Sequence, residues 1–139
     1  MKFYKHLLFV AILVLGAGIA SAQSKKTIRE KKIVSVTVNE YFLEEGMVDP
    51  VVESIEKFNA KGELVEVKEF NKSGDVKKWE KYAYDADGNL VEEVFLDMKG
   101  RVSRTEKTIY DGDLKVQKNY FDNKDYLYKK KVYNYEYSQ

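Results

Sequence analysis

The stretch YDADGNL, residues 84–90, gathers oxygen-bearing side chains of the kind that bind calcium. Two aspartates and an asparagine surround Gly88, and an EF-hand loop likewise places Asp and Asn ligands around an invariant glycine. In that register the loop would also need an oxygen ligand at Ala83 and a bidentate glutamate at Val94, and neither residue provides one. The stretch is therefore interpreted as a hairpin turn, and no metal site is expected there.

Side chains suited to catalysis are scarce in the rest of the chain. The only histidine, His6, lies in a segment that we expect to be removed, and there is no cysteine, so Ser-His and Cys-His triads are excluded beyond that segment. The carboxylate pairs Glu44–Glu45 and Glu92–Glu93 are adjacent in sequence, so within a strand their side chains would point to opposite faces and could not flank one bond. We therefore expect neither an enzyme nor a cofactor.

The first 22 residues have the pattern of a secretory signal peptide. Lys2 and Lys5 precede the apolar stretch LLFVAILVLGAGIA, and Ala20-Ser21-Ala22 is a small-residue cleavage site. The apolar stretch is shorter than the ~20 residues that a membrane-spanning helix requires. We expect an exported chain beginning at Gln23, periplasmic, extracellular or on the cell surface. Without a cysteine it would not be a lipoprotein, and no membrane span would remain after signal removal.

Charge excludes one class of partner. Beyond residue 22 the chain has 22 basic and 23 acidic residues, an almost balanced set. A balanced surface gives no general attraction to phosphate groups, so no nucleic-acid partner is expected.

A short motif recurs through the middle of the chain. An apolar residue is followed by Asn or Asp, two variable residues, Gly, one more residue and an aliphatic side chain, as in FNAKGEL, FNKSGDV, YDADGNL and LDMKGRV. A shortened copy, YDGDL, begins at Tyr110. Phe58, Tyr84 and Tyr110 lie 26 residues apart, so the repeating unit is a pair of turns. Each glycine is expected at the positive φ of its hairpin loop, a three-residue loop at Gly62, Gly74, Gly88 and Gly100 and a two-residue loop at Gly112.

The segments between the turns are rich in Val, Tyr, Phe and Thr and contain no proline, as antiparallel strands require. Pairing across each loop predicts that Phe58 faces Leu64, and likewise at the later turns. Uninterrupted alternation would then place all these flanking residues on one face. In the shortened copy, a two-residue turn at Asp111-Gly112 predicts that Tyr110 pairs with Asp113.

These patterns predict an all-β domain, an antiparallel hairpin meander of about eight strands. Neither predicted face is a continuous hydrophobic wall, which favours a twisted single sheet over the alternative, a rolled and nearly closed barrel. Residues 23–32 are predicted to be a loose charged arm, and residues 33–139 a single β-repeat domain that starts with a strand at 33–42. For residues 50–57 a strand is preferred over a short helix capped at Asp49-Pro50.

The motif YAYDADGNL resembles the YD repeats of exported bacterial proteins, and the alternation from Phe58 to Leu127 is similar to MORN-variant repeats common in exported proteins of Bacteroidota. The resemblance implies a β-hairpin repeat architecture and an exported chain. It covers about half of the sequence, with too few repeats to enclose a cargo as the large YD-repeat shells do.

For function we expect a structural or protein-interaction component of the cell envelope that binds another envelope or surface protein. The alternative is a carbohydrate-binding module that stacks aromatic side chains on sugar rings. The candidate binding residues for either function are Trp79, Tyr133, Tyr135 and Tyr137. The three consecutive lysines at 129–131 are expected to protect an exposed edge strand from unwanted pairing.

Overall fold

The structure, a computed structural model, describes residues 23–46 and 49–138. The expected signal peptide, residues 1–22, lies outside the described residues. The elements are α1 (Lys25–Glu30), β1 (Ser35–Glu40), the short 3-10 helix η1 (Leu43–Glu45), β2 (Val51–Phe58), β3 (Leu64–Phe70), β4 (Val76–Tyr84), β5 (Leu90–Leu96), β6 (Val102–Asp111), β7 (Leu114–Asp122) and β8 (Leu127–Val132).

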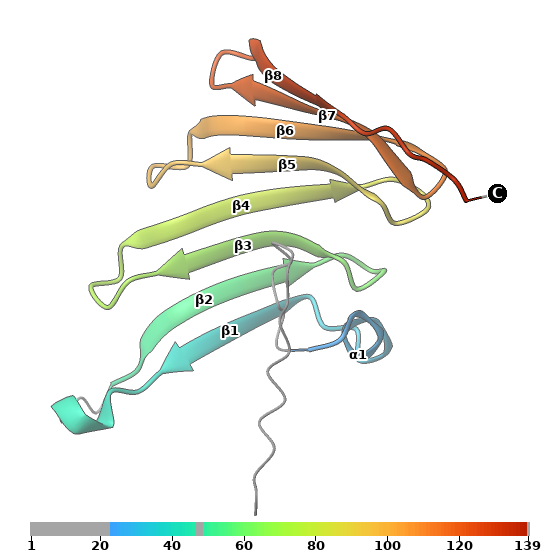
Figure 1. Cartoon of the computed structure of the whole chain (residues 1–139). Helices are drawn as coiled ribbons and strands as arrows, with labels where there is room; N and C mark the ends of the chain where they lie inside the picture. Colours follow the sequence, from blue (N-terminus) through green and yellow to red (C-terminus); the bar gives the residue numbers. More distant parts are fainter. Residues whose placement is uncertain (1–22, 47–48, 139) are drawn as a thin grey trace, which may run out of the picture.

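The eight strands form one antiparallel sheet in chain order, which confirms the predicted meander (Figure 1). β1 and β8 lie at opposite edges and do not pair, so the alternative of a closed barrel is wrong. Residues 50–57 fall almost entirely within β2, as preferred from the sequence, and the strand expected over 33–42 is present as the shorter β1.

Five of the turns share one hydrogen-bonding scheme. In the turn between β2 and β3, the Asn59 side-chain oxygen accepts from the backbone N–H groups of Lys61 and Glu63. An equivalent oxygen does so at each of the other four: Asn71, Asp85, Asp97 and Asp122. Four of these turns have a glycine at φ between +79° and +86°, and the fifth has Asp125 at +62°. The loops thereby hold the predicted pairs, such as Phe58 with Leu64.

Alternation along the strands is interrupted, and here the sequence expectation is wrong. Next to each turn one strand carries an extra residue: Phe58 pairs with Leu64, but Lys57 pairs with Glu66, which leaves Val65 unpaired. Such a β-bulge changes which face the following side chains occupy. Directly opposed residues share a face, so Phe58 and Leu64 lie on one face of the sheet, while the residues next to the following turn, Phe70 and Val76, lie on the other.

The two faces are defined by this register. We call one the tyrosine face, because it carries Tyr82, Tyr84, Tyr110 and Tyr120. The other is called the opposite face. It carries Trp79, Val102, Ile109, Phe121 and Leu127. The apolar residues beside the turns at one end of the strands, such as Phe58 and Leu64, therefore point to the tyrosine face. Those beside the turns at the other end of the strands, such as Phe70 and Val76, point to the opposite face, so the two sets do not form one wall.

The shortened copy of the motif also differs from its prediction. Tyr110 pairs with Lys115 and Asp111 pairs with Leu114, so the two loop residues are Gly112 and Asp113. β6 therefore extends one residue further than predicted, to Asp111. The register then shifts around Val116, which brings Phe121 opposite Thr105 on the opposite face.

The expected loose arm at residues 23–32 is wrong as well, because part of it forms α1. The Ser24 side chain caps this helix by accepting from the Thr27 backbone N–H at 3.1 Å. Ile28 is 1% exposed, and α1 lies at the turn between β2 and β3 (Figure 1). A Cβ on Gly62 would lie 2.4 Å from the Lys25 carbonyl oxygen, so glycine permits this close packing.

Few side chains of the described residues are fully buried. The buried apolar ones are Ile28, Phe58, Val67, Tyr82 and Tyr120, and most strand residues on both faces keep some exposure. A sheet with this little core is stabilised by contacts between neighbouring side chains on adjacent strands, which contribute ~0.2–1 kcal/mol each.

Candidate functional site

A shallow groove of about 580 Å³ lies on the tyrosine face. Its walls are formed by side chains from β3 to β7: Leu64, Lys78, Glu80, Tyr82, Tyr84, Leu90, Glu93, Phe95, Arg104, Glu106 and Lys118. Cationic and acidic side chains are equally numerous in this lining. The groove is therefore polar but carries no excess of either charge.

Lys118 is the centre of the charged side chains in the groove. Its Nζ lies 2.7 Å from a Glu93 oxygen and 2.6 Å from a Glu106 oxygen, and the lysine side chain is 15% exposed. Burial alone would lower the pKa of Lys118, but the hydrogen bonds to Glu106 and Glu93 outweigh it and hold the pKa above its ordinary value. Arg104 adds a second ion pair to Glu106, with Nε 2.9 Å from the carboxylate.

Tyr82 and Glu80 form a second polar pair in the groove. The Tyr82 hydroxyl donates to Glu80, and burial together with this hydrogen bond raises the pKa of the phenol. Lys78 lies 3.6 Å from the same carboxylate. The carboxylates of Glu80, Glu93 and Glu106 thus all have partners within the sheet. This arrangement stabilises the sheet, and it presents no unpaired base to a substrate in the groove.

Three tyrosine hydroxyl groups donate to backbone carbonyl groups of the strands. Tyr84 donates to the Leu64 carbonyl at 2.8 Å, Tyr110 to that of Leu90 at 3.2 Å, and Tyr135 to that of Lys115 at 2.7 Å. In each case the acceptor lies twenty residues before the tyrosine. Burial raises the pKa values of Tyr84 and Tyr110. These bonds recur with the repeat, and we call the three residues the tyrosine ladder.

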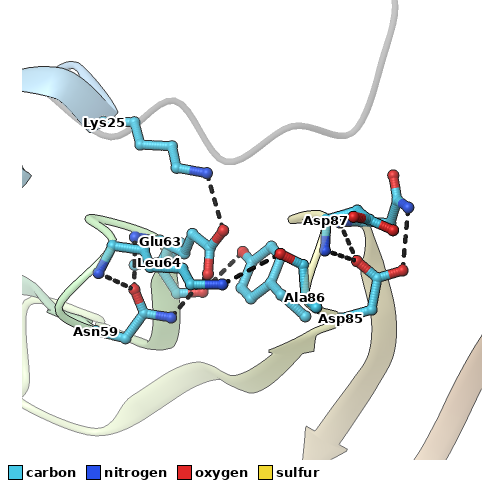
Figure 2. A network of polar contacts seen from close by, with 10 residues as sticks. Lys25, Asn59, Glu63, Leu64, Asp85, Ala86 and Asp87 are labelled. Carbon is cyan, nitrogen blue, oxygen red and sulfur yellow. Dashed lines mark hydrogen bonds and ion pairs between the residues drawn. The ribbon is translucent and has the colours of Figure 1, made fainter. Parts of the chain in front are cut away.

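The region around Asp85 and Asp87 is part of a structural network at one end of the sheet (Figure 2). Asp85 accepts from the backbone of Asp87 and from Asn89, and these hydrogen bonds, that of the Asn89 side chain first, lower its pKa. Lys61 of the neighbouring turn reaches the Ala86 carbonyl at 3.3 Å. No group of three or more His, Cys, Asp or Glu side chains disposed to hold a metal occurs among the described residues.

The adjacent turn is held to α1 by the side chain of Glu63. One carboxylate oxygen accepts from Lys25 of the helix at 2.9 Å and the other from Asn59 at 2.8 Å (Figure 2). Glu63 is nearly buried. Desolvation would raise its pKa, but the hydrogen bonds from Asn59 and Lys25 outweigh desolvation and lower the pKa.

β8 forms one edge of the sheet, and all six of its residues are exposed. On the tyrosine face, Lys129 and Lys131 lie with their Nζ atoms 4.4 Å and 5.8 Å from the ring centre of Tyr120. The Tyr128 ring lies 6.4 Å from the same ring. The edge therefore combines aromatic surface with positive charge.

The opposite face carries exposed apolar side chains on the same strands. β6 to β8 contribute Val102, Ile109, Leu114, Leu127 and Val132, all at least 38% exposed. The pairings of β6 to β8 place these five residues on one face. In soluble proteins an exposed apolar surface of this kind is a common feature of interaction sites.

Trp79, the first of the predicted binding residues, lies on β4, and its side chain contacts other side chains of the sheet. Its ring lies beneath Lys68, with Nζ 3.4 Å from the centre of one ring, and its Nε1 donates to Glu66 at 2.7 Å. A Cβ on Gly100 would lie 2.9 Å from the indole, which shows how closely the ring packs on that turn. The opposite face therefore holds Trp79, four strands away from the predicted tyrosines.

The predicted tyrosines lie beyond β8, which ends at Val132. Tyr133 donates its backbone N–H to the Val116 carbonyl at 3.0 Å, and Tyr135 belongs to the tyrosine ladder. Tyr137 is 77% exposed. The structure thus brings Tyr133 and Tyr135 close to β7, and only Tyr137 presents most of its surface.

Sequence reasoning did not single out Tyr120, which lies under the lysines of β8. Its pairing with Lys129 is set by the bulge at Tyr128, beside the turn between β7 and β8. Uninterrupted alternation from the pair of Phe121 and Leu127 places Tyr128 opposite Tyr120 instead, so the pairing was not found.

Among the described residues there is no helix of the length and apolar character needed to span a membrane. No protein-family model matches the chain, and a search of curated proteins gives no match.

Proposed function

We propose that this protein is a non-enzymatic, exported β-repeat module that acts as a structural or protein-interaction component of the cell envelope. In this proposal the chain is a relative of the YD and MORN-variant repeat proteins, made of three successive 26-residue units. Its partner is another envelope or surface protein.

The observation that carries the proposal is the edge formed by β8. Every residue of this strand is exposed, its outer backbone groups are unpaired within the described part of the chain, and exposed apolar side chains lie beside it on β6 and β7. Free edges of this kind accept added strands from partner chains. The charged groove has fully paired carboxylates, which supports binding rather than catalysis as the activity of the fold.

Site-specific photocrosslinking in cells tests the proposal. A photoreactive residue placed at Lys130 on β8 should give one defined adduct with an envelope protein. The same residue at Lys81, in the middle of the sheet on β4, should give none. Absence of an adduct from Lys130, or an identical set of adducts from both positions, would show that the β8 edge is not the binding surface.

Carbohydrate binding is the second candidate, because Tyr126 and Tyr128 at the β8 end are 68% and 57% exposed. Exposed aromatic rings stack on sugar rings. Retention of the purified protein on insoluble polysaccharide, and its loss when both tyrosines are changed to Ser, would favour this function over the first.

A further inference from the structure

The backbone of β8 presents its outward hydrogen-bonding groups at defined residues. In an antiparallel pair, opposed residues alternate between bonded and non-bonded positions. Tyr133 donates to Val116, so Lys131 and Lys129 also bond inward to β7, whereas Lys130 and Val132 direct their N–H and C=O groups outward. An incoming strand would bond to these two residues.

The same edge carries positive charge that the sheet does not neutralise. Lys129 and Lys131 lie on the tyrosine face, and Lys130 lies on the opposite face, paired with Asn119. Among the ion pairs between described residues, none involves these three lysines, whereas Lys118 of β7 has two acidic partners. The edge therefore carries a cation at each of three consecutive positions, two on the tyrosine face and one on the opposite face.

This charge distribution discriminates between possible added strands. Antiparallel pairing of β8 with β8 of a second copy would oppose lysine to lysine, which is destabilising. The free edge of β1, Ser35–Glu40, has a single acidic residue at its end and offers little to attract a lysine-rich strand. A strand with consecutive acidic residues would be attracted to the opposed lysine at each position where a second copy of β8 would be repelled.

We propose that the β8 edge binds an extended acidic segment of a partner protein, which adds a ninth strand to the sheet. This inference rests on the proposed function and names the chemistry of its partner. Three consecutive acidic residues would lie opposite Lys129, Lys130 and Lys131. An apolar residue on either side would cover the exposed Leu127 and Val132.

A synthetic peptide tests the proposal directly on the purified protein. A peptide containing Val-Glu-Glu-Glu-Thr-Val should bind, and the matched peptide with Gln in place of each Glu should bind about tenfold more weakly, because it loses three cross-strand charge pairs. The difference should shrink at high salt. In hydrogen exchange, the amides of Lys130 and Val132 should gain protection on binding.

Two proline variants provide matched controls for the mode of binding. Lys130→Pro removes an outward N–H, so the variant should keep its melting temperature but lose the peptide, since proline is tolerated at an edge position whose N–H faces solvent. Lys131→Pro removes an inward bond to β7 and should lower the melting temperature. Changing all three lysines to Glu should abolish binding of the Glu peptide and create binding of a Lys peptide.

Equal affinity for the Glu and Gln peptides, or undiminished binding by Lys130→Pro, would overturn the proposal. So would exchange protection that appears on β1, or self-association of the protein in sedimentation that the peptide does not compete with. If the peptide fails while the photocrosslink at Lys130 still captures a partner, the acidic chemistry is wrong and the proposed function stands. If both fail, the proposed function fails too.

Discussion

Alanine substitution at three turn glycines should separate the cost of backbone strain from the cost of lost space. Gly74, Gly100 and Gly62 all lie at positive φ, between +79° and +83°. Their surroundings differ. An added Cβ would meet nothing within 4 Å at Gly74, the Trp79 ring at 2.9 Å at Gly100, and the Lys25 carbonyl oxygen at 2.4 Å at Gly62.

The expected losses in unfolding free energy follow from these distances. Gly74→Ala should cost about 1–2 kcal/mol, the penalty of an L-residue in the left-handed region. Gly100→Ala adds an overpacking term of about 1 kcal/mol, because the indole can shift only by disturbing its contacts with Lys68 and Glu66. Gly62→Ala adds about 2–3 kcal/mol, because the obstacle is the backbone of α1 and the helix itself must move.

Urea unfolding monitored by far-UV circular dichroism measures all three variants on one scale. The extra loss of unfolding free energy at Gly100, relative to Gly74, should vanish when Trp79 is changed to Ala in both variants. The effects of substitutions at residues in contact are coupled, whereas those at distant residues are additive. Equal losses at the three glycines would refute the packing of α1 and of Trp79 described above. A Gly100 excess that survives the loss of Trp79 would refute the indole contact alone.

Three further predictions concern individual side chains. The low folded-state pKa of Glu63 contributes stability above the ordinary value of 4.5, and this stability should be lost as pH falls through the lower folded value, so acid unfolding should be shallower in a Lys25→Met variant, which removes one of its hydrogen bonds. The raised pKa of Tyr82 contributes stability below pH 10 that should be lost as pH rises further, and Tyr82→Phe should reduce the alkaline loss in a denaturation series from neutral to alkaline pH, leaving the part that Tyr84 and Tyr110 contribute. Tyr135→Phe should lower the unfolding free energy by about 1 kcal/mol through its lost hydrogen bond, whereas Tyr137→Thr should change it by less than about 0.5 kcal/mol, and an equal effect of the two in urea unfolding would contradict the tyrosine ladder.

The sequence was sufficient to locate the turns and the pairs beside them. Asx residues and glycines recur at fixed offsets, and each supplies a local interaction that does not depend on the rest of the fold. That is why Phe58 opposite Leu64 and Leu96 opposite Val102 were found without a structure. Local chemistry also fixed the strand character of β2 over a competing helix.

The bulges were not predictable by the same reasoning. Val65, Lys77 and Ser103 differ in size and polarity, yet each is the unpaired residue after its turn. No residue type marks the position, because the shift follows from how the loop and the twisted strands fit together. The helix α1 was missed for a related reason: it packs on the turn at Gly62, which lies far along the chain.

These bulges explain why the sheet has a single layer and two unlike faces. The apolar residues beside the turns at one end of the strands lie on one face, and those beside the turns at the other end lie on the other face. Neither face therefore collects enough apolar surface to require a second layer. The main contacts of each strand are with its sequence neighbours, so the fold is extended in one dimension and its ends are open. α1 lies on the side of the sheet formed by β1 to β3, whereas β8, at the other edge, carries only positive charge. An asymmetric sheet of this kind can accept a different chain at its cationic edge while disfavouring a copy of that same edge.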